Sequence, residues 1–517
     1  MTVKEIKNGV GRMIPTEING KSVNPFMGLG KHRPQGKIIG SSIPTCLDYP
    51  LDGDKTVPSL KEALIKAGLK DGMTISTHHH LRNGDLVANE IFKIASQLGV
   101  KDLTWYPSAS FPSHEPLIEF LKNGTIHHIE GSMNGPLGRF TSQGKMKGVG
   151  ILRSHGGRVQ ALKNGEVKID IAVMAAPASD KFGNANGQRG PSACGVLGYA
   201  KADSMFAEKV IIVTDHLENF PCMPMEVEGN YVDYVVEVDH IGIPEKIVSG
   251  TTKVTTVPER LEIAELSAQF LLESGILKDR GFIQAGAGGI SLAIGQFIHQ
   301  IFKKKGWKIQ VGFGGSTEYM VSMLKDGTME HLLDGQAFDL TAVHSITQNA
   351  NHNSYPVFNA YNFHSKGNLN SMMDLSILGA TEVDVNFNAN VVTHSDGYLL
   401  HGIGGWQNCL HAKNVILPLP LVRRNIPVVR DEVTTIVGPG ELIDVIITNH
   451  GIAINPERKD LLEKMKNSTL PIVTIEELKD KAEQICGKQE KPDFTDKVVA
   501  AVKWVDGTVI DVIRQIK

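Results

Sequence analysis

Residues 71–85 of the chain read DGMTISTHHHLRNGD, and this stretch decides the fold class. Its apolar part, residues 73–77, predicts a strand that runs directly into a polar turn. A helix is expected next, because residues 86–98 (LVANEIFKIASQL) place apolar side chains at helical spacing. A strand that turns into a helix is typical of α/β proteins, in which ligands lie at the carboxyl ends of the strands.

Further apolar runs favour a parallel sheet. Residues 169–176 (IDIAVMAA) and 210–215 (VIIVTD) are apolar almost without interruption, as in parallel strands that are covered on both faces. Another helix is expected at residues 258–277, because Pro-Glu is followed there by a helical pattern. The sequence therefore predicts an α/β protein with open sheets and helices on both faces of each sheet.

Length and composition exclude several classes of protein. The 517 residues are too many for one ordinary domain, and a net charge of −3 favours neither a nucleic-acid partner nor a membrane surface. Five cysteines without a CxxC spacing argue against a disulfide framework and a cysteine zinc site. Because we find no signal peptide and no long apolar run, we expect a cytoplasmic protein.

An internal repeat indicates the domain organisation. Residues 113–128 (SHEPLIEFLKNGTIHH) and 316–331 (STEYMVSMLKDGTMEH) share a serine, a glutamate, Leu-Lys, Gly-Thr and a final histidine. Each copy predicts a helix that ends at Asn-Gly or Asp-Gly, and the repetition predicts two similar α/β domains. The expected parts are an N-terminal arm at 1–50, a first domain at 51–255, and a second domain at 256–517 that ends in a helical tail from about Thr469.

Three consecutive histidines, His78, His79 and His80, follow the strand predicted at 73–77. His78 and His80 would point to one side of an extended backbone, and imidazole is a common zinc ligand, so a metal site is one interpretation. No carboxylate or further histidine stands nearby at a telling spacing, and we predict no metal. Binding of an anion is favoured, because the forked guanidinium of Arg82 lies close by. Hydrogen bonds from the histidines to the backbone are the alternative.

Residues 176–194 (APASDKFGNANGQRGPSAC) follow a predicted strand and precede a helix that is expected to begin near Ser192. Glycine and asparagine tolerate unusual backbone angles, so a loop that surrounds a ligand closely is plausible. Arg189 would lie just before a helix N-terminus, which attracts anions. We predict that Asn184, Asn186 and Arg189 bind substrate, and a purely structural connector is the alternative.

Two glycine clusters could present backbone N–H groups to a ligand. Residues 402–408 (GIGGWQN) follow a strand-like stretch at 396–401, and residues 286–291 read GAGGIS. Such amides can hold a developing oxyanion during acyl transfer. Neither cluster matches a dinucleotide or P-loop motif, and a tight turn is the ordinary alternative. The glycines concerned are Gly286, Gly288, Gly289, Gly402, Gly404 and Gly405.

Several long motifs together resemble the alpha subunits of citrate lyase. DGMTI at 71–75 is similar to the entry of a CoA-transferase domain, with three histidines in place of the usual Gly-Gly-Phe. The resemblance covers nearly the whole chain and implies two tandem CoA-transferase-like (NagB/RpiA-like) domains. The other segments that carry it are residues 178–195, 237–261, 312–320 (GFGGSTEYM) and 401–414 (HGIGGWQNCLHAKN).

The resemblance also implies an activity. In citrate lyase the alpha subunit exchanges acetyl for citryl on a CoA-like prosthetic thiol, which an acyl carrier protein bears, and releases acetate. A separate beta subunit then cleaves the citryl-carrier. The resemblance therefore implies that this chain binds no cofactor of its own, and acetyl-CoA could stand in for the carrier. Its expected partners are the beta subunit, the gamma subunit (the acyl carrier protein) and further copies of itself.

The implied mechanism is attack of a citrate carboxylate on the acetyl thioester through a mixed anhydride, in a ternary complex. By resemblance, the amides of Gly404 and Gly405 would stabilise the oxyanion, and both glycine clusters would bind the prosthetic group. Related CoA-transferases use a glutamate as a covalent relay, and Glu318 is the candidate here. Its repeat partner Glu115 favours a structural role instead. We expect citrate to be bound by His78, His79, His80, Arg82, Asn184, Asn186 and Arg189.

Three alternatives stay open. The chain could belong with the alpha subunits of citramalate lyase, because a citramalate pocket would differ by few contacts. It could be a related CoA-transferase that uses free CoA. It could also be a non-catalytic scaffold subunit, although glycine- and histidine-rich loops at strand ends argue against that role.

Overall fold

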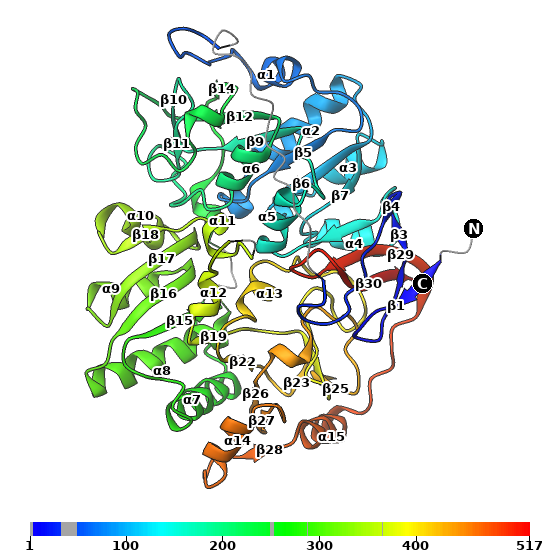
Figure 1. Cartoon of the computed structure of the whole chain (residues 1–517), viewed down its shortest axis with the longest axis vertical. Helices are drawn as coiled ribbons and strands as arrows, with labels where there is room; N and C mark the ends of the chain where they lie inside the picture. The colour runs from blue at the N-terminus through cyan, green and yellow to red at the C-terminus, as the bar shows by residue number, and fades with distance from the viewer. Residues whose placement is uncertain (1–3, 33–48, 249–252, 287, 364) are drawn as a thin grey trace.

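A computed structural model of the chain describes residues 4–32, 49–248, 253–286, 288–363 and 365–517, and two sheets dominate it (Figure 1). The first sheet has the order β14-β12-β9-β5-β6-β7, and all neighbouring strands are parallel. Its strands are β5 (Thr74–Thr77), β6 (Leu103–Pro107), β7 (Ile126–Ile129), β9 (Ile171–Ala175), β12 (Lys209–Thr214) and β14 (Tyr234–Glu237). The helices of this half are α1 (Leu60–Lys66), α2 (Val87–Gln97), α3 (Leu117–Lys122), α4 (Pro136–Ser142), α5 (His155–Lys163) and α6 (Ala200–Phe206).

The second sheet has nine strands in the order β18-β17-β16-β15-β19-β22-β26-β27-β28, and only the β26–β27 pair is antiparallel. Its strands are β15 (Gly281–Ala285), β16 (Ile309–Ser316), β17 (Met329–Ala337), β18 (His352–Ser354), β19 (Leu375–Ile377), β22 (Val415–Pro418), β26 (Val445–Thr448), β27 (Gly451–Ile454) and β28 (Ile472–Val473). The helices are α7 (Pro258–Glu273), α8 (Gly289–Lys305), α9 (Glu318–Lys325), α10 (Leu340–Gln348), α11 (Val357–Ala360), α12 (Leu369–Met372), α13 (Trp406–Cys409), α14 (Lys459–Met465) and α15 (Ile475–Cys486).

The two sheets repeat one arrangement. The order β7-β6-β5-β9-β12-β14 in the first half corresponds to β17-β16-β15-β19-β22-β26 in the second. In both copies the repeated helix, α3 or α9, is followed by a glycine with positive φ, Gly124 (+80°) or Gly327 (+78°), and then by a strand. The prediction of two similar α/β domains with open sheets is confirmed. The exact domain limits stay predictions.

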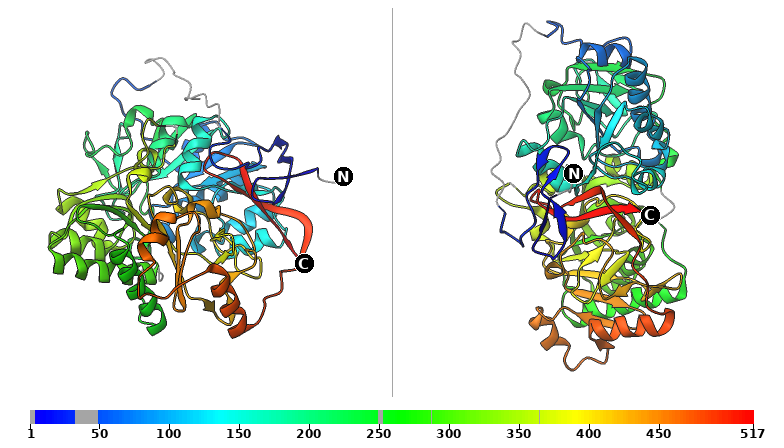
Figure 2. Two further views of the ribbon diagram at one scale, coloured as in Figure 1. Left: turned by 60° about the horizontal axis from the view of Figure 1, so that its bottom comes forward. Right: turned by 90° about the vertical axis from the view of Figure 1, so that its right-hand side faces the viewer.

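The two ends of the chain meet beside the first domain (Figure 2). β29 (Phe494–Lys503) and β30 (Val509–Ile516) form an antiparallel hairpin, and β29 pairs in parallel with β8 (Gly150–Leu152) of the first half. The N-terminal arm joins the hairpin, because Phe26 N–H donates to Val509 O at 3.0 Å and Val509 N–H donates to Asn24 O at 2.8 Å. The hairpin and the arm bury a small core of their own, formed by Ile14, Ile18, Ile151, Ala501, Val509 and Val512.

The prediction of a helical tail was therefore wrong beyond α15. The last segments are rich in buried β-branched residues, such as Val499, Val502 and Ile510, and these favour strands once β8 offers an edge. Two smaller predictions were also wrong. Residues 396–401 form no strand and contribute only the Thr393–Leu399 bridge, and the helix expected near Ser192 begins at Ala200, as α6.

The remaining apolar side chains of both sheets form one continuous core, so the two domains pack against each other over a shared apolar interior. Among the described helices, none is both long enough and apolar enough to span a bilayer.

Candidate active site

A cavity of about 920 Å³ lies where the two domains face each other. Most of its lining follows the carboxyl ends of parallel strands, which is where ligands bind in open α/β sheets. From the first domain come the segments after β5, β6 and β7, and from the second come residues on or after β15, β16, β17, β19 and β22. Because strand ends of both sheets converge on one space, the cavity is the natural candidate for an active site.

The charged side chains of the lining are all basic. Four arginines and three histidines reach the cavity, and none of the described residues that line it is an aspartate or a glutamate. These basic residues are Arg82, Arg153, Arg260, Arg423, His79, His155 and His401. The cavity therefore suits an anion, and in particular one that carries several carboxylates.

Among the arginines of this lining, Arg82 and the exposed Arg260 have no partner within the described residues, whereas the other two are paired. Arg153 is paired with Glu166 at 3.0 Å, and Arg423 donates to Ala380 O at 3.1 Å. The Arg82 side chain forms no hydrogen bond or ion pair with any described residue. It lies over the rings of two phenylalanines, Phe338 at 4.4 Å and Phe111 at 5.4 Å, and burial lowers the pKa of Arg82 to about 10. It remains charged near neutral pH and is held ready for an anionic ligand.

His79 is the one histidine of the triplet that reaches the cavity. Its Nδ1 lies 2.6 Å from Ser108 Oγ, and its Nε2 lies 3.0 Å from Gln336 Oε1. The Tyr199 ring stacks beside it at 4.3 Å, and Tyr199 Oη lies 3.3 Å from His155 Nε2. Burial lowers the pKa of His79 well below its usual range and that of His155 to about 3, so both imidazoles are neutral.

His78 and His80 do not line the cavity. His78 Nε2 lies 2.9 Å from Asp203, a buried carboxylate that also binds Arg158 and Ser76. His80 is stacked on His78 with ring centroids 5.4 Å apart, as expected for alternate residues of an extended backbone. Within the described residues no group of His, Cys, Asp and Glu is arranged to hold a metal ion. Both histidines belong to the interior of the first domain, which argues against direct substrate contacts for them.

All six glycines of the two clusters line the cavity. Gly286, Gly288 and Gly289 lead into the N-terminus of α8, a helix end that attracts anions. Gly404 adopts the left-handed conformation (φ +63°), and its carbonyl accepts a hydrogen bond from the His155 N–H at 2.8 Å. The amides of Gly404 and Gly405 donate to no described residue and are free for a ligand.

The loop at 176–194 contributes none of its predicted ligands. Asp180 holds a tight turn: it accepts hydrogen bonds from the Asn184 backbone at 3.1 Å and side chain at 2.8 Å, while Asn184 accepts from Gly229 N–H. Asn186 is buried beside Cys222. Arg189 is half-exposed and paired with Glu218 at 2.5 Å. The structure places all three predicted ligands outside the cavity, so their role as substrate ligands has no support from geometry.

Glu318 also lies outside the cavity. It is exposed at the start of α9, where its backbone N–H donates to Asp339 Oδ2 at 2.6 Å. Its repeat partner Glu115 is exposed as well. The geometry therefore argues against Glu318 as a covalent relay.

Several cavity residues escaped prediction, among them Ser108, His155, Tyr199 and Gln336. Only His155 carried a local signal, because Ser154 caps α5 and is separated from a short apolar run by Arg153 alone. β8, which the C-terminal hairpin extends, leads into this cap and so fixes His155 at the cavity.

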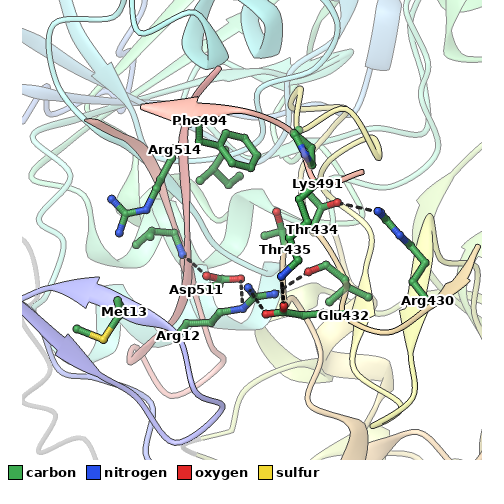
Figure 3. Close-up of a pocket in the computed structure, with 15 residues that line it drawn as sticks. Arg12, Met13, Arg430, Glu432, Thr434, Thr435, Lys491, Phe494, Asp511 and Arg514 are labelled. Carbon is green, nitrogen blue, oxygen red and sulfur yellow. Dashed lines mark hydrogen bonds and ion pairs between the residues drawn. The ribbon is translucent and has the colours of Figure 1, made fainter. Parts of the chain in front are cut away.

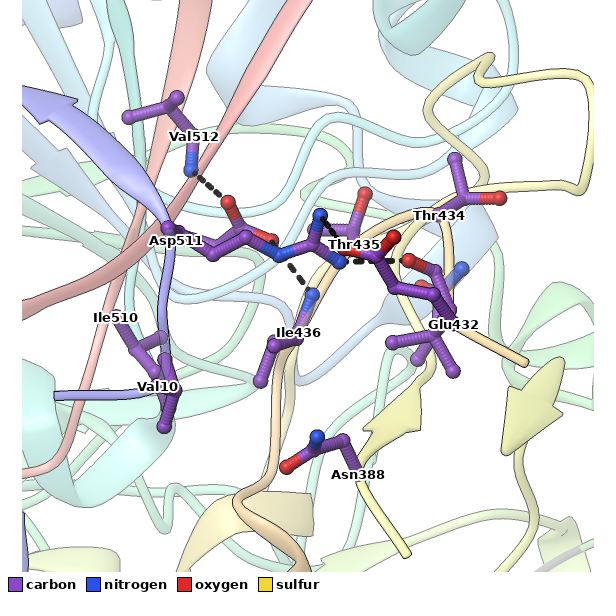
Figure 4. A network of polar contacts seen from close by, with 12 residues as sticks. Val10, Asn388, Glu432, Thr434, Thr435, Ile436, Ile510, Asp511 and Val512 are labelled. Carbon is purple, nitrogen blue, oxygen red and sulfur yellow. Dashed lines mark hydrogen bonds and ion pairs between the residues drawn. The ribbon is translucent and has the colours of Figure 1, made fainter. Parts of the chain in front are cut away.

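A second, smaller pocket of about 260 Å³ lies between the arm, the hairpin and the segment after β25 (Val429–Arg430) (Figure 3). Arg12 lies 2.8 Å from Glu432 and 3.3 Å from Asp511, which accepts hydrogen bonds from Ile436 N–H at 2.7 Å and Val512 N–H at 2.8 Å (Figure 4). Every other cation of this pocket is also paired: Arg430 with Glu382, Lys491 with Glu432, and Arg514 with Glu5. This pocket is a joint between the chain ends and the second domain.

Comparison with known proteins gives one consistent result. The family described as citrate lyase, alpha subunit (CitF), matches residues 53–516. The citrate lyase alpha chain of Klebsiella pneumoniae is 41% identical over 465 residues, which are 90% of this chain and 92% of that one. The corresponding chain of Haemophilus influenzae is 40% identical and covers 90% and 93%.

Solved structures agree with the sequence comparison. The putative alpha subunit of citrate lyase from Streptococcus mutans, solved in complex with citrate, is similar with a TM-score of 0.94 and 40% identity, and covers 99% of this chain and 100% of that one. The alpha subunit of a malonate decarboxylase from Acinetobacter baumannii shares the fold, with a TM-score of 0.62 at 13% identity over 84% of this chain and 91% of that one.

Proposed function

The chain belongs to the family of citrate lyase alpha subunits, and from this premise we propose that its cavity exchanges acetyl for citryl on a carrier thiol. The observation that carries the proposal is the cavity itself, which is rich in arginine and histidine and has no carboxylate among its described lining residues. Citrate brings three carboxylates, and such a site supplies cations for them while no carboxylate lies in its described lining.

Arg82 is the proposed primary ligand of citrate. Its guanidinium has no partner among the described residues, so a citrate carboxylate can accept two parallel hydrogen bonds from it. The Nε2–H of His79 already donates to Gln336 Oε1. His79 therefore forms part of the cavity wall and has no free Nε2–H for citrate. The citrate complex of the Streptococcus mutans relative supports a citrate site in this family.

The chemistry that we propose is carboxylate attack. A citrate carboxylate adds to the acetyl thioester carbonyl, and the carrier thiolate leaves, which forms a mixed anhydride. The thiolate then attacks the citryl carbonyl of the anhydride, and acetate leaves. The nucleophile is a substrate carboxylate, so a cavity without a protein carboxylate fits a ternary complex better than a glutamyl relay.

Both steps place negative charge on a carbonyl oxygen. The free amides of Gly404 and Gly405 are the donors that we propose for it, and loss of one such donor typically costs about 3–4 kcal/mol. The prosthetic arm would enter along Gly286, Gly288 and Gly289, where the N-terminus of α8 faces the cavity. We propose the beta subunit and the acyl carrier protein of citrate lyase as partners, because an alpha subunit is one part of an enzyme with several different subunits.

The decisive experiment mixes the purified chain with acetyl-CoA, as a surrogate for the acetylated carrier, and with citrate or citramalate. Mass spectrometry then follows citryl-CoA, citramalyl-CoA and acetate with time. We expect citryl-CoA and acetate without oxaloacetate. A faster reaction with citramalate would favour the citramalate alternative. No transfer from either acetyl-CoA or acetylated carrier protein would overturn the catalytic proposal in favour of the scaffold alternative.

A further inference from the structure

Gln336 crosses from the second domain to the first at the cavity wall. It lies near the end of β17 and is buried, with 4% of its surface exposed. Its Nε2 donates to the backbone carbonyl of His79 at 2.9 Å. Its Oε1 lies 3.0 Å from His79 Nε2 and 3.3 Å from Tyr199 Oη. One amide therefore contacts the backbone and the ring of one histidine at the same time.

These contacts leave a single arrangement of protons. A carbonyl can only accept, so the amide NH₂ of Gln336 must face His79 O, and Oε1 must face the ring. His79 Nε2 must then carry the hydrogen that Oε1 accepts. Its bare Nδ1 accepts from the hydroxyl of Ser108, whose oxygen in turn accepts the His79 backbone N–H at 3.1 Å. Every donor in the set finds one acceptor.

The same glutamine reaches further into the site. Tyr199 Oη lies 3.3 Å from both Gln336 Oε1 and His155 Nε2, so its hydroxyl hydrogen can be directed to either. The His155 backbone is bound to Gly404 O, on the turn that carries the free amides. The amide of Gln336 thus connects the β17 end, the histidine wall and the glycine turn.

We propose that Gln336 is a positioning residue that holds His79 in the Nε2–H form, so that this wall of the citrate site has one fixed arrangement of donors and acceptors. This inference rests on the proposed acyl exchange. That reaction consumes and releases no proton, because a carboxylate and a thiolate exchange places as nucleophile and leaving group. Burial holds the pKa of His79 well below its usual range, although the hydrogen bond to Gln336 works against this, so the wall beside the reaction carries no titrating group.

Gln336→Glu is the informative variant, since it keeps the shape and introduces a titrating group. At low pH the protonated carboxyl donates to His79 O as the amide did. Burial raises the pKa of such a carboxyl, and its ionisation places a negative charge beside the citrate site. We expect kcat/KM for citrate to fall at least tenfold between pH 5 and pH 8 in this variant. The wild-type profile should show only the effect of citrate's own ionisation, so the fall is measured as the ratio of the variant to the wild type.

Gln336→Met is the matched control, because it keeps the volume without hydrogen bonds or charge. It should lower kcat/KM by a constant factor at all pH values. Parallel profiles for wild type and Gln336→Glu would overturn the inference.

An inactive wild type would instead count against the proposed reaction, and a spectroscopic measurement then tests Gln336 alone. Nitrogen-15 spectra of labelled histidines, with the His79 signals identified by His79→Gln, should show the Nε2–H form in the wild type. In Gln336→Met this preference should be lost, and its retention would also overturn the inference.

Discussion

Arg82 is the residue on which the proposed substrate contact depends. It sits at a left-handed backbone position (φ +51°) directly after the histidine triplet, and two phenylalanine rings enclose its guanidinium. An arginine that is buried among rings without a carboxylate is costly unless a ligand pairs with it. Selection for binding rather than for stability explains such a residue best.

We expect Arg82→Ala to raise the KM for citrate about 10- to 100-fold, as a charged hydrogen-bonded contact of about 1.5–3 kcal/mol implies. The KM for acetyl-CoA should change far less. Arg189→Ala is the matched control, because Arg189 forms an exposed ion pair with Glu218 outside the cavity. Steady-state kinetics with both substrates varied would measure this. Equal effects of Arg82→Ala on both KM values would rule out a citrate contact.

Glu318→Ala tests the covalent relay. Because Glu318 is exposed outside the cavity, we expect kcat to change less than about twofold, as is usual for surface substitutions. A relay residue would instead lose several orders of magnitude. The same experiment can search for a glutamyl thioester by mass spectrometry of protein incubated with acetyl-CoA alone. A trapped adduct on Glu318 would contradict the ternary-complex proposal.

Sequence reasoning reached some of these residues and missed others for physical reasons. Arg82 and His79 could be predicted because they follow directly on a strand end. Gln336 and Tyr199 could not, since their importance comes from partners in the other domain. The predicted substrate contact of Asn184 has no support from the geometry, because a glycine- and asparagine-rich turn looks alike in sequence whether it surrounds a ligand or stabilises itself.

At the scale of elements, the duplication supports a structural role for this turn. In the second domain, β20 (Glu382–Asp384) and β21 (Ala389–Asn390) form the same turn as β10 (Ala178–Asp180) and β11 (Ala185–Asn186) in the first. Asp384 accepts from the Asn388 side chain at 3.2 Å, and Asn388 accepts from Gly440 N–H at 3.0 Å, as Asp180 and Asn184 do in their copy. A turn present in both copies and absent from the cavity is structural.

Asn184→Ala and Asn388→Ala should therefore behave alike. Each removes buried hydrogen bonds and should lower the free energy of unfolding by about 1–3 kcal/mol, with no change in the KM for citrate. Urea unfolding and steady-state kinetics of both variants would check this. If Asn184→Ala alone raised the KM, the turn of the first domain would have a binding role after all.

Most of the strands and helices could be predicted from the sequence, because the core of each parallel sheet consists of uninterrupted apolar runs. The C-terminal hairpin could not be predicted from the sequence in this way. Its strands gain their hydrogen bonds from β8 and the N-terminal arm, which are remote in sequence. Such non-local pairing cannot be recognised from the local sequence, even though the β-branched residues favour strands.

At the scale of the whole molecule, the joint around Arg12 connects both chain ends to the second domain. Burial raises the pKa of Asp511 to about 6, whereas the nearby guanidinium of Arg12 works against this rise. Between about pH 4 and pH 6 the folded protein keeps a proton on Asp511 that the unfolded chain has lost. Stability from this group is therefore present at low pH and is lost as the pH rises to about 6.

Asp511→Asn should remove that dependence. A rise of about two units corresponds to about 3 kcal/mol, so the free energy of unfolding of the wild type should fall relative to the variant by up to this amount between pH 4 and pH 6.5. Urea unfolding of both proteins across this range is the measurement. A constant difference between the two would show that folding does not raise the pKa of Asp511.

The pairing of β8 with β29 has a consequence for the order of events during synthesis. β8 emerges from the ribosome early, whereas the strand that completes its sheet is among the last to be made. Until then Ile151 lacks the apolar side chains that cover it. The strand before Arg153 and His155 also lacks its β29 partner, so these two residues are not yet held in place. Ribosome-bound chains that end at Gly487 should be cleaved by protease near residues 150–155, whereas full-length chains should resist. We therefore expect the cavity to be completed only once β29 has been made and has paired with β8.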